Sequence, residues 1–217
     1  MGMNDRQLRL IVIDELDFEP SIDATRIDVS VELGMVTLGG YARSYAEKRA
    51  AEKVACRVRG VRAVSERIEV AAPNGKPVGD AELTRRALDT LAWDATVPDS
   101  VRVKVRSGHV RLSGLVDWHY QRQAAEHAVS RLAGILGISN LIAIRPGSHV
   151  YDIGRAIEDA LRRSAELDAC NIRVLVADDD TVMLEGEVHA WFERAIAERA
   201  AWSAPGVKMV EDRLLVA

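Results

Sequence analysis

The sequence lacks the features that mark secreted, fibrous and membrane-spanning chains. Only two of its 217 residues are cysteine, too few for the disulfide framework of a small secreted fold, so we expect Cys56 and Cys170 to be reduced thiols. Six prolines exclude a proline-rich or collagen-like chain. The first apolar run, residues 10–13, is too short for a signal peptide, and no run approaches the roughly 20 apolar residues of a membrane span. With no lipidation cysteine either, these absences predict a cytoplasmic protein.

Aromatic residues and net charge are also low. Aromatics make up 5% of the chain, which argues against a surface that stacks bases or a large cofactor. The formal net charge is −4 and the sequence pI is about 5.8, so the chain does not resemble a nucleic-acid binder. Apolar residues make up 48% and charged residues 29%, a composition that buries a core and stays in solution.

A seven-residue segment with alternating apolar positions occurs three times, at residues 34–40, 108–114 and 180–186. In each copy a second glycine lies 20 residues after the last position, and an aliphatic residue follows it directly. These three ungapped copies identify tandem repeats. We interpret the first glycines as strand ends and the second as helix C-termini, where a left-handed residue fits. The first set is Gly40, Gly114 and Gly186, and the second is Gly60, Gly134 and Gly206.

Each repeat predicts the same order of elements. Aliphatic residues at helical spacing come first, then an alternating β-branched strand, the seven-residue segment, an alanine-rich helix and a last strand. The short turn between the first two strands predicts an antiparallel hairpin, and the helical crossover predicts that the last two strands are parallel. The fold class is therefore α+β, as three tandem αββαβ repeats, each a mixed three-stranded sheet covered on one face by two helices. The expected boundaries are residues 4–71, 79–145 and 150–217.

These residues carry a resemblance to a known family. The helix, the alternating strand, the Gly-x-Val-x-Leu-x-Gly strand, the Ala/Glu helix and the Gly-Val-x-x-Val ending resemble the BON (bacterial OsmY and nodulation) domain, in three copies that cover nearly all of the chain. The resemblance implies an αββαβ fold. It also implies a non-catalytic module that binds phospholipid or envelope surfaces, with a role in osmotic or envelope stress.

No residue set predicts catalysis or a metal site. The five histidines share no metal-ligand spacing, and Asp178–Asp180 lacks the glycine and closing glutamate of a calcium loop. Three glutamates recur at one position of the second helix, each four residues after a basic residue, and we interpret them as solvated helix pairs. The pairs are Lys48–Glu52, Arg122–Glu126 and Arg194–Glu198. We therefore expect no enzyme, cofactor or metal.

The charge is unevenly divided among the repeats. Residues 73–146 carry 10 basic and 7 acidic residues, net +3, whereas residues 147–217 carry 8 and 14, net −6. Side chains alternate along a strand, so the basic residues of the middle hairpin share its outer face. They are Arg102, Lys104, Arg106 and Arg111. This face is either a site for anionic phospholipid or an ordinary solvated surface.

Two apolar groups suggest further contacts. Trp118 and Tyr120, at the start of the second helix of the middle repeat, suit a membrane interface and equally suit packing against the core or a neighbouring repeat. Leu175, Met183 and Leu215 are expected on the outer sheet face of the third repeat, where they would contact another repeat or another chain in a homo-oligomer. The preferred function is a non-catalytic protein that binds an anionic membrane surface. The alternative is a self-associating structural or protein-binding stress adaptor.

Overall fold

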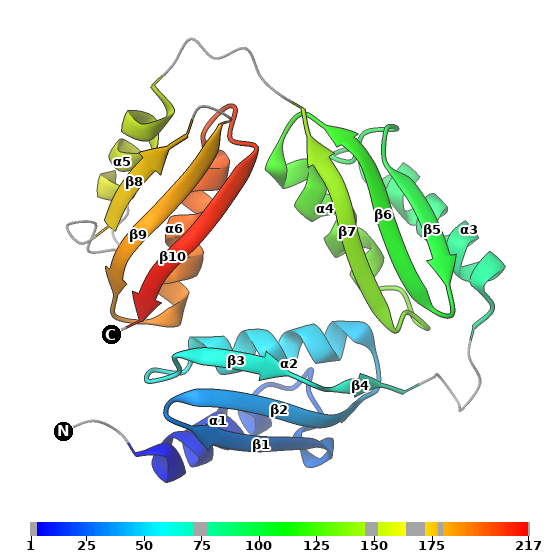
Figure 1. Cartoon of the computed structure of the whole chain (residues 1–217). Helices are drawn as coiled ribbons and strands as arrows, with labels where there is room; N and C mark the ends of the chain where they lie inside the picture. Colours follow the sequence, from blue (N-terminus) through cyan, green and yellow to red (C-terminus); the bar gives the residue numbers. More distant parts are fainter. Residues whose placement is uncertain (1–3, 72–77, 146–151, 164–171, 178–179, 217) are drawn as a thin grey trace.

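The computed structural model describes residues 4–71, 78–145, 152–163, 172–177 and 180–216. It confirms the α+β class and the three tandem repeats, which we call repeats 1, 2 and 3 in chain order (Figure 1). Cys170, Asp178 and Asp179 lie outside the described residues. None of the helices within the described ranges combines the length and the apolar character needed to cross a bilayer.

The elements follow the predicted order in every repeat. Repeat 1 contains α1 (Asp5–Phe18), the 3-10 turn η1 (Ala24–Arg26), β1 (Ile27–Glu32), β2 (Met35–Ala42), α2 (Tyr45–Arg57), β3 (Ala63–Glu66) and β4 (Glu69–Val70). Repeat 2 contains α3 (Asp80–Trp93), β5 (Arg102–Arg106), β6 (His109–Val116), α4 (His119–Ser130) and β7 (Gly137–Ile144). Repeat 3 contains α5 (Ile153–Arg163), β8 (Ile172–Val176), β9 (Thr181–Val188), α6 (Trp191–Ser203) and β10 (Met209–Val216).

The sheet topology matches the prediction from the crossover. The first two strands of each repeat pair antiparallel, and the last strand pairs parallel to the second, which lies in the middle of the sheet. In repeat 1 the last strand is divided into β3 and β4, and both pair with β2. The two helices of each repeat cover one sheet face and leave the other face open (Figure 1).

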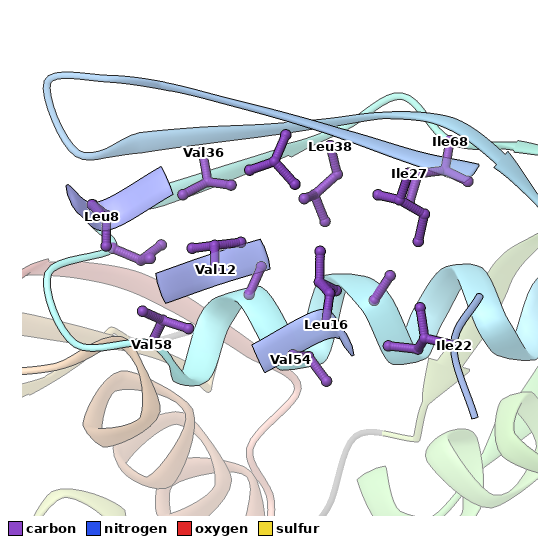
Figure 2. Packing of buried hydrophobic residues seen from close by; sticks show 14 of the residues in the cluster. Leu8, Val12, Leu16, Ile22, Ile27, Val36, Leu38, Val54, Val58 and Ile68 are labelled. Atoms are coloured by element: carbon purple, nitrogen blue, oxygen red, sulfur yellow. The ribbon is translucent and has the colours of Figure 1, made fainter. Parts of the chain in front are cut away.

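Each repeat has its own apolar core between its helices and its sheet. In repeat 1, Leu8, Val12 and Leu16 form one stripe of α1 and pack against Val36 and Leu38 of β2 (Figure 2). All five side chains are almost completely buried. Burial of one such aliphatic side chain stabilises the fold by about 1.5–3 kcal/mol. The four-residue spacing of these side chains places them on one face of the helix, and this face holds α1 on the sheet.

Gly40 is not the end of a strand, contrary to our interpretation of the first glycine set. It pairs with Ile27 inside β2, which continues to Ala42. Its φ is +94°, and a Cβ at this position would collide with the carbonyl oxygen of Arg26. Gly114 has a φ of +139° and the same conflict with the carbonyl of Ser100. The glycine is required because another segment of backbone approaches it closely.

The basic residues of the second helices do not pair with glutamates four residues later, so the prediction of helix pairs was wrong. Lys48 contacts Glu66 on β3, with 2.9 Å between Nζ and Oε2, and Arg194 contacts Asp212 on β10. In repeat 2, Asn140 of β7 donates to the backbone carbonyl of Arg122. In repeats 1 and 3 the basic side chain reaches the last strand because this helix lies over it. The residue at this position therefore ties the crossover helix to the sheet.

The three repeats contact one another through their second helices. Figure 1 shows the repeats as the three sides of a triangle, with α2, α4 and α6 toward its centre. Helix α6 contacts both α2 and α4. Tyr45 of α2 is buried in the core of repeat 2, and His119 of α4 stacks on Trp202 of α6 with ring centroids 3.9 Å apart. Tyr45 and His119 are equivalent residues, so one helix position supplies two contacts between repeats.

Candidate functional site

The strongest candidate site is the outer face of the β5–β6 hairpin in repeat 2. Arg102, Lys104 and Arg106 alternate along β5 and are all exposed. The register places Lys104 opposite Arg111 of β6, and Arg106 opposite His109. The structure therefore brings together the four cations predicted from the sequence. We call Arg102, Lys104, Arg106 and Arg111 the basic face.

The basic face pairs with no carboxylate among the described residues. Its neighbours on the outer sheet surface are uncharged or imidazole side chains, and the register places no Asp or Glu beside them. Among the described residues, no ion pair involves any of the four cations, whereas Arg85 and Arg86 on α3 both pair with Glu82. Unpaired cations on one surface attract anions because their positive potentials add. The arrangement is therefore suited to a ligand with several negative charges.

A shallow depression of about 640 Å³ lies at the hairpin end of this surface. Its lining includes Thr84 of α3 and strand residues, which are Val103, Lys104, Val105, Arg106, His109, Val110, Arg111 and Ser139. The Lys and Arg side chains of this lining can only donate hydrogen bonds, whereas His109 and Ser139 can both donate and accept them. The depression therefore has three cationic side chains in its lining.

The charge of the basic face is not required by the fold. In repeat 1 the residues in the same hairpin register are Asp28, Ser30, Glu32 and Thr37, which form an antiparallel pair of the same geometry. In repeat 3 the outer face of β8 carries Arg173 and Leu175. The same hairpin therefore forms with acidic, basic or apolar outer residues, and it does not need cations at these positions.

Asp80, at the start of α3, holds the hairpin that carries the basic face. Its carboxylate accepts hydrogen bonds from the backbone N–H groups of Ser107 at 2.7 Å and of Gly108 at 2.9 Å. These two hydrogen bonds lower the pKa of Asp80 below its ordinary value. Asp5 binds the hairpin turn of repeat 1 in the same way. The sequence analysis missed both residues, although each lies three residues before the first buried leucine of its helix.

The structure does not bring the two predicted aromatic residues to the basic face. Trp118 and Tyr120 are exposed by 41% and 56%, and they follow the end of β6 that is opposite to the hairpin turn. Seven residues separate Arg111 from Trp118, which corresponds to roughly 23 Å along an extended chain. The aromatic pair and the basic face would therefore contact one membrane surface only at separate points.

The predicted apolar residues of repeat 3 are also only partly gathered. Leu175 and Met183 are direct partners across the β8–β9 ladder. Leu215 instead lies beside Glu187, and the pair Arg213–Glu185, at 3.6 Å, separates it from the other two. Leu175 and Met183 therefore form one small apolar patch next to the edge of the sheet, and Leu215 lies apart from it.

No geometry of the described residues supports a metal site or a reactive thiol. His119 stacks on Trp202, and no group of three or more His, Cys, Asp or Glu in the described ranges is placed to hold a metal ion. Burial raises the pKa of the Cys56 thiol to about 11, which keeps it protonated and unreactive at neutral pH. The basic face therefore remains the candidate with the clearest chemistry.

Comparisons with known proteins find the family that the sequence resembles. The model of the BON domain matches residues 4–72, 79–146 and 151–217. A curated relative, osmotically-inducible protein Y of Escherichia coli (strain K12), is 32% identical over 143 residues, which cover 64% of this chain and 71% of the relative.

Two solved structures of CdsD, a structural protein of the type III secretion system of Chlamydia trachomatis, also align with the chain. They cover 99% and 96% of it, at 12% and 14% identity, with TM-scores of 0.27 and 0.26. The alignments cover 100% and 93% of the CdsD chains, but these TM-scores are too low to indicate a common arrangement. The three family matches and the 32% identical relative decide the assignment: the chain belongs to the BON domain family.

Proposed function

We propose that the chain binds anionic phospholipid surfaces through the basic face of repeat 2. The observation that carries the proposal is a set of four exposed cations in one hairpin, without ion-pair partners in the described part of the chain, where repeat 1 has acidic residues. Arginine and lysine are the side chains that recognise phosphate groups. No catalytic step is part of this function.

The binding is weak, reversible and sensitive to salt. Each basic residue close to an anionic membrane contributes about 1 kcal/mol, so four such residues give an affinity that salt easily abolishes. The net charge of the whole chain is −4, so repulsion by the acidic parts opposes the attraction. Only a membrane rich in anionic lipid would therefore hold the protein.

The name of the relative supports a role in osmotic stress. Osmotically-inducible protein Y is named for its induction by osmotic stress, and its match spans 64% of this chain. We infer that this chain acts at a lipid surface during osmotic stress as a non-catalytic component.

Co-sedimentation with vesicles tests the proposal. We expect binding to phosphatidylglycerol–phosphatidylcholine vesicles at about 0.01 M salt, weaker binding at about 0.15 M, and no binding to phosphatidylcholine alone. The variant Lys104→Glu/Arg111→Glu should bind at least about tenfold more weakly, because it removes two cations that contribute about 1 kcal/mol each.

The matched control is Arg59→Glu/Arg67→Glu, which changes the net charge equally at exposed positions of repeat 1. It should bind nearly as well as the unmodified protein. Equal weakening by both variants would show that only the net charge matters. Absence of binding to the anionic vesicles at low salt would exclude the lipid function.

A further inference from the structure

Each sheet has two outermost strands among the strands that the structure describes, one from its hairpin and one after its crossover helix. The three outermost hairpin strands each have one unpaired edge. These strands are β1, β5 and β8. In an antiparallel hairpin, alternate residues direct their N–H and C=O groups away from the partner strand. The N–H of Ala177 donates to the carbonyl oxygen of Thr181 across the β8–β9 hairpin at 2.9 Å. By alternation, the backbone N–H and C=O groups of Leu175 and Arg173 also point toward β9. The backbone groups of Ile172, Val174 and Val176 consequently point to the open edge.

The edge of β1 is closed by a side chain. Nε of Arg9, on α1, donates to the carbonyl oxygen of Val29 at 2.7 Å. Val29 is one of the residues whose backbone faces outward from β1, since it alternates with Asp28 and Ser30 in the ladder. Arg9 therefore occupies an acceptor that a further strand would need.

The edge of β5 is protected by like charges. Its outer side chains are Arg102, Lys104 and Arg106, all cations. If β5 paired antiparallel with a second copy of itself, every outer pair would place one cation against another, whatever the register. Like charges directly opposite each other destabilise a strand pair, and charged edge strands are a common protection against association.

Among the residues that the structure describes, the edge of β8 has neither protection. The residue equivalent to Arg9 is Gly154, because each follows the first buried aliphatic residue of its helix, Leu8 or Ile153. Arg173 is the only charged residue of β8, and Leu175 and Val176 are exposed by 49% and 41%. An open edge with apolar side chains is a template for another strand.

We propose that the partner of this edge is β8 of a second copy of the chain, paired antiparallel about a two-fold axis at Val174. Val174 then faces its own copy, Ile172 faces Val176, and Arg173 faces Leu175, so no like charges meet. The two three-stranded sheets of repeat 3 become one continuous six-stranded sheet. Identical patches form such an isologous interface because the strand is self-complementary.

The contact is small, since each chain contributes one five-residue strand. Interfaces below about 1,200 Å² are usually transient, so the dimer forms only at high protein concentration. It lies in repeat 3 and is independent of the basic face and of the lipid function proposed above.

Sedimentation equilibrium of the full chain tests the dimer. We expect the mass to rise from one chain toward two between about 1 and 500 μM, the range in which weak contacts form. Gly154→Arg, which supplies the side chain that closes the β1 edge, should raise the dissociation constant at least about tenfold. Gly154→Ala is the matched control, because its Cβ would lie 3.4 Å from Val176 Cγ2, an ordinary contact, and leave the edge open.

A second pair of variants separates pairing at the edge from docking on the sheet face. Leu175→Lys places a cation opposite Arg173 of the other copy and should dissociate the dimer, whereas Leu215→Lys alters the same sheet face on β10 and should not. Far-ultraviolet circular dichroism confirms that each variant is folded. A mass of one chain at every concentration, a dimer that survives Gly154→Arg, or dissociation by Leu215→Lys would overturn the proposal.

Discussion

At the scale of single residues, two neighbouring glycines show how a sequence position acquires its identity. Gly39 and Gly40 are adjacent in β2, yet only Gly40 has a positive φ and a backbone carbonyl at the place of its missing Cβ. The residues equivalent to Gly39 are Ser113 and Glu185, whereas glycine stands at all three positions equivalent to Gly40. Of these two positions, only the one where the backbone requires glycine has glycine in all three repeats.

Replacing Gly40 by alanine should destabilise repeat 1 strongly. A non-glycine residue at positive φ costs about 1–3 kcal/mol, and the collision with the Arg26 carbonyl adds to this. Urea unfolding of Gly40→Ala should show a loss of at least about 2 kcal/mol. Gly39→Ala is the control, since its Cβ would meet only the Asp28 side chain at 3.9 Å. Equal stability of the two variants would contradict this account.

At the scale of the elements, each hairpin depends on the first helix of its repeat. Leu33 and Gly34 form the turn of the β1–β2 hairpin with φ values of +51° and +78°, and Ser107 and Gly108 form the next one with +50° and +74°. Two residues with positive φ are typical of a type I′ turn, whose twist fits the strands. Asp80 binds the N–H groups of the second turn, so α3 fixes the hairpin that carries the basic face.

This contact gives a dependence of stability on pH. The pKa of Asp80 is lower in the folded chain than its ordinary value of 3.8, so its stabilising effect is complete above that value and is lost as the pH falls through the folded pKa. Asp80→Asn should lower the thermal midpoint at pH 7 and reduce the further loss between about pH 4 and pH 2. Melting curves at several pH values measure both effects, and an unchanged midpoint at pH 7 would show that the contact contributes nothing.

The hairpins and the basic face are the part that sequence reasoning could predict. Alternation with a period of two places Arg102, Lys104 and Arg106 on one face wherever β5 forms, and the structure confirms this placement. The contacts of Lys48 and Arg194 could not be predicted, because helical spacing offers a glutamate four residues away while the true partners lie on another strand. Periodicity specifies which face a residue occupies but not its partner from a distant segment.

At the scale of the whole molecule, aromatic contacts connect the repeats. His119 lies between α4 and α6, where it stacks on Trp202 at 3.9 Å, and its Nδ1 is buried without a hydrogen-bond partner in the described part of the chain. Burial first, and the charge of Arg122 second, lower the pKa of His119 to about 4. The Nε1–H of Trp202 donates to Glu198, the nearest carboxylate seen to contact the stack. The contact between repeats 2 and 3 therefore favours the neutral imidazole.

Acidification should weaken this contact. Because the pKa of His119 falls from 6.5 to about 4 on folding, the folded chain binds fewer protons, and stability declines as the pH falls from about 6.5 toward 4. His119→Phe keeps an aromatic ring against Trp202 and removes the titration. Its urea midpoint should change less between pH 7 and pH 5 than that of the unmodified protein, and an identical change in both would assign the pH effect to other groups.

The sequence by itself determined the repeated fold, because three copies of the same apolar spacing can bury their faces only in the same αββαβ arrangement. It also determined that the cations of the middle hairpin share one face, since strand alternation is a local property. Only the tertiary structure decided how the repeats contact one another and which sheet edge is open. Those features depend on single side chains, such as Arg9 against Val29 or His119 against Trp202, that meet from segments far apart in the chain.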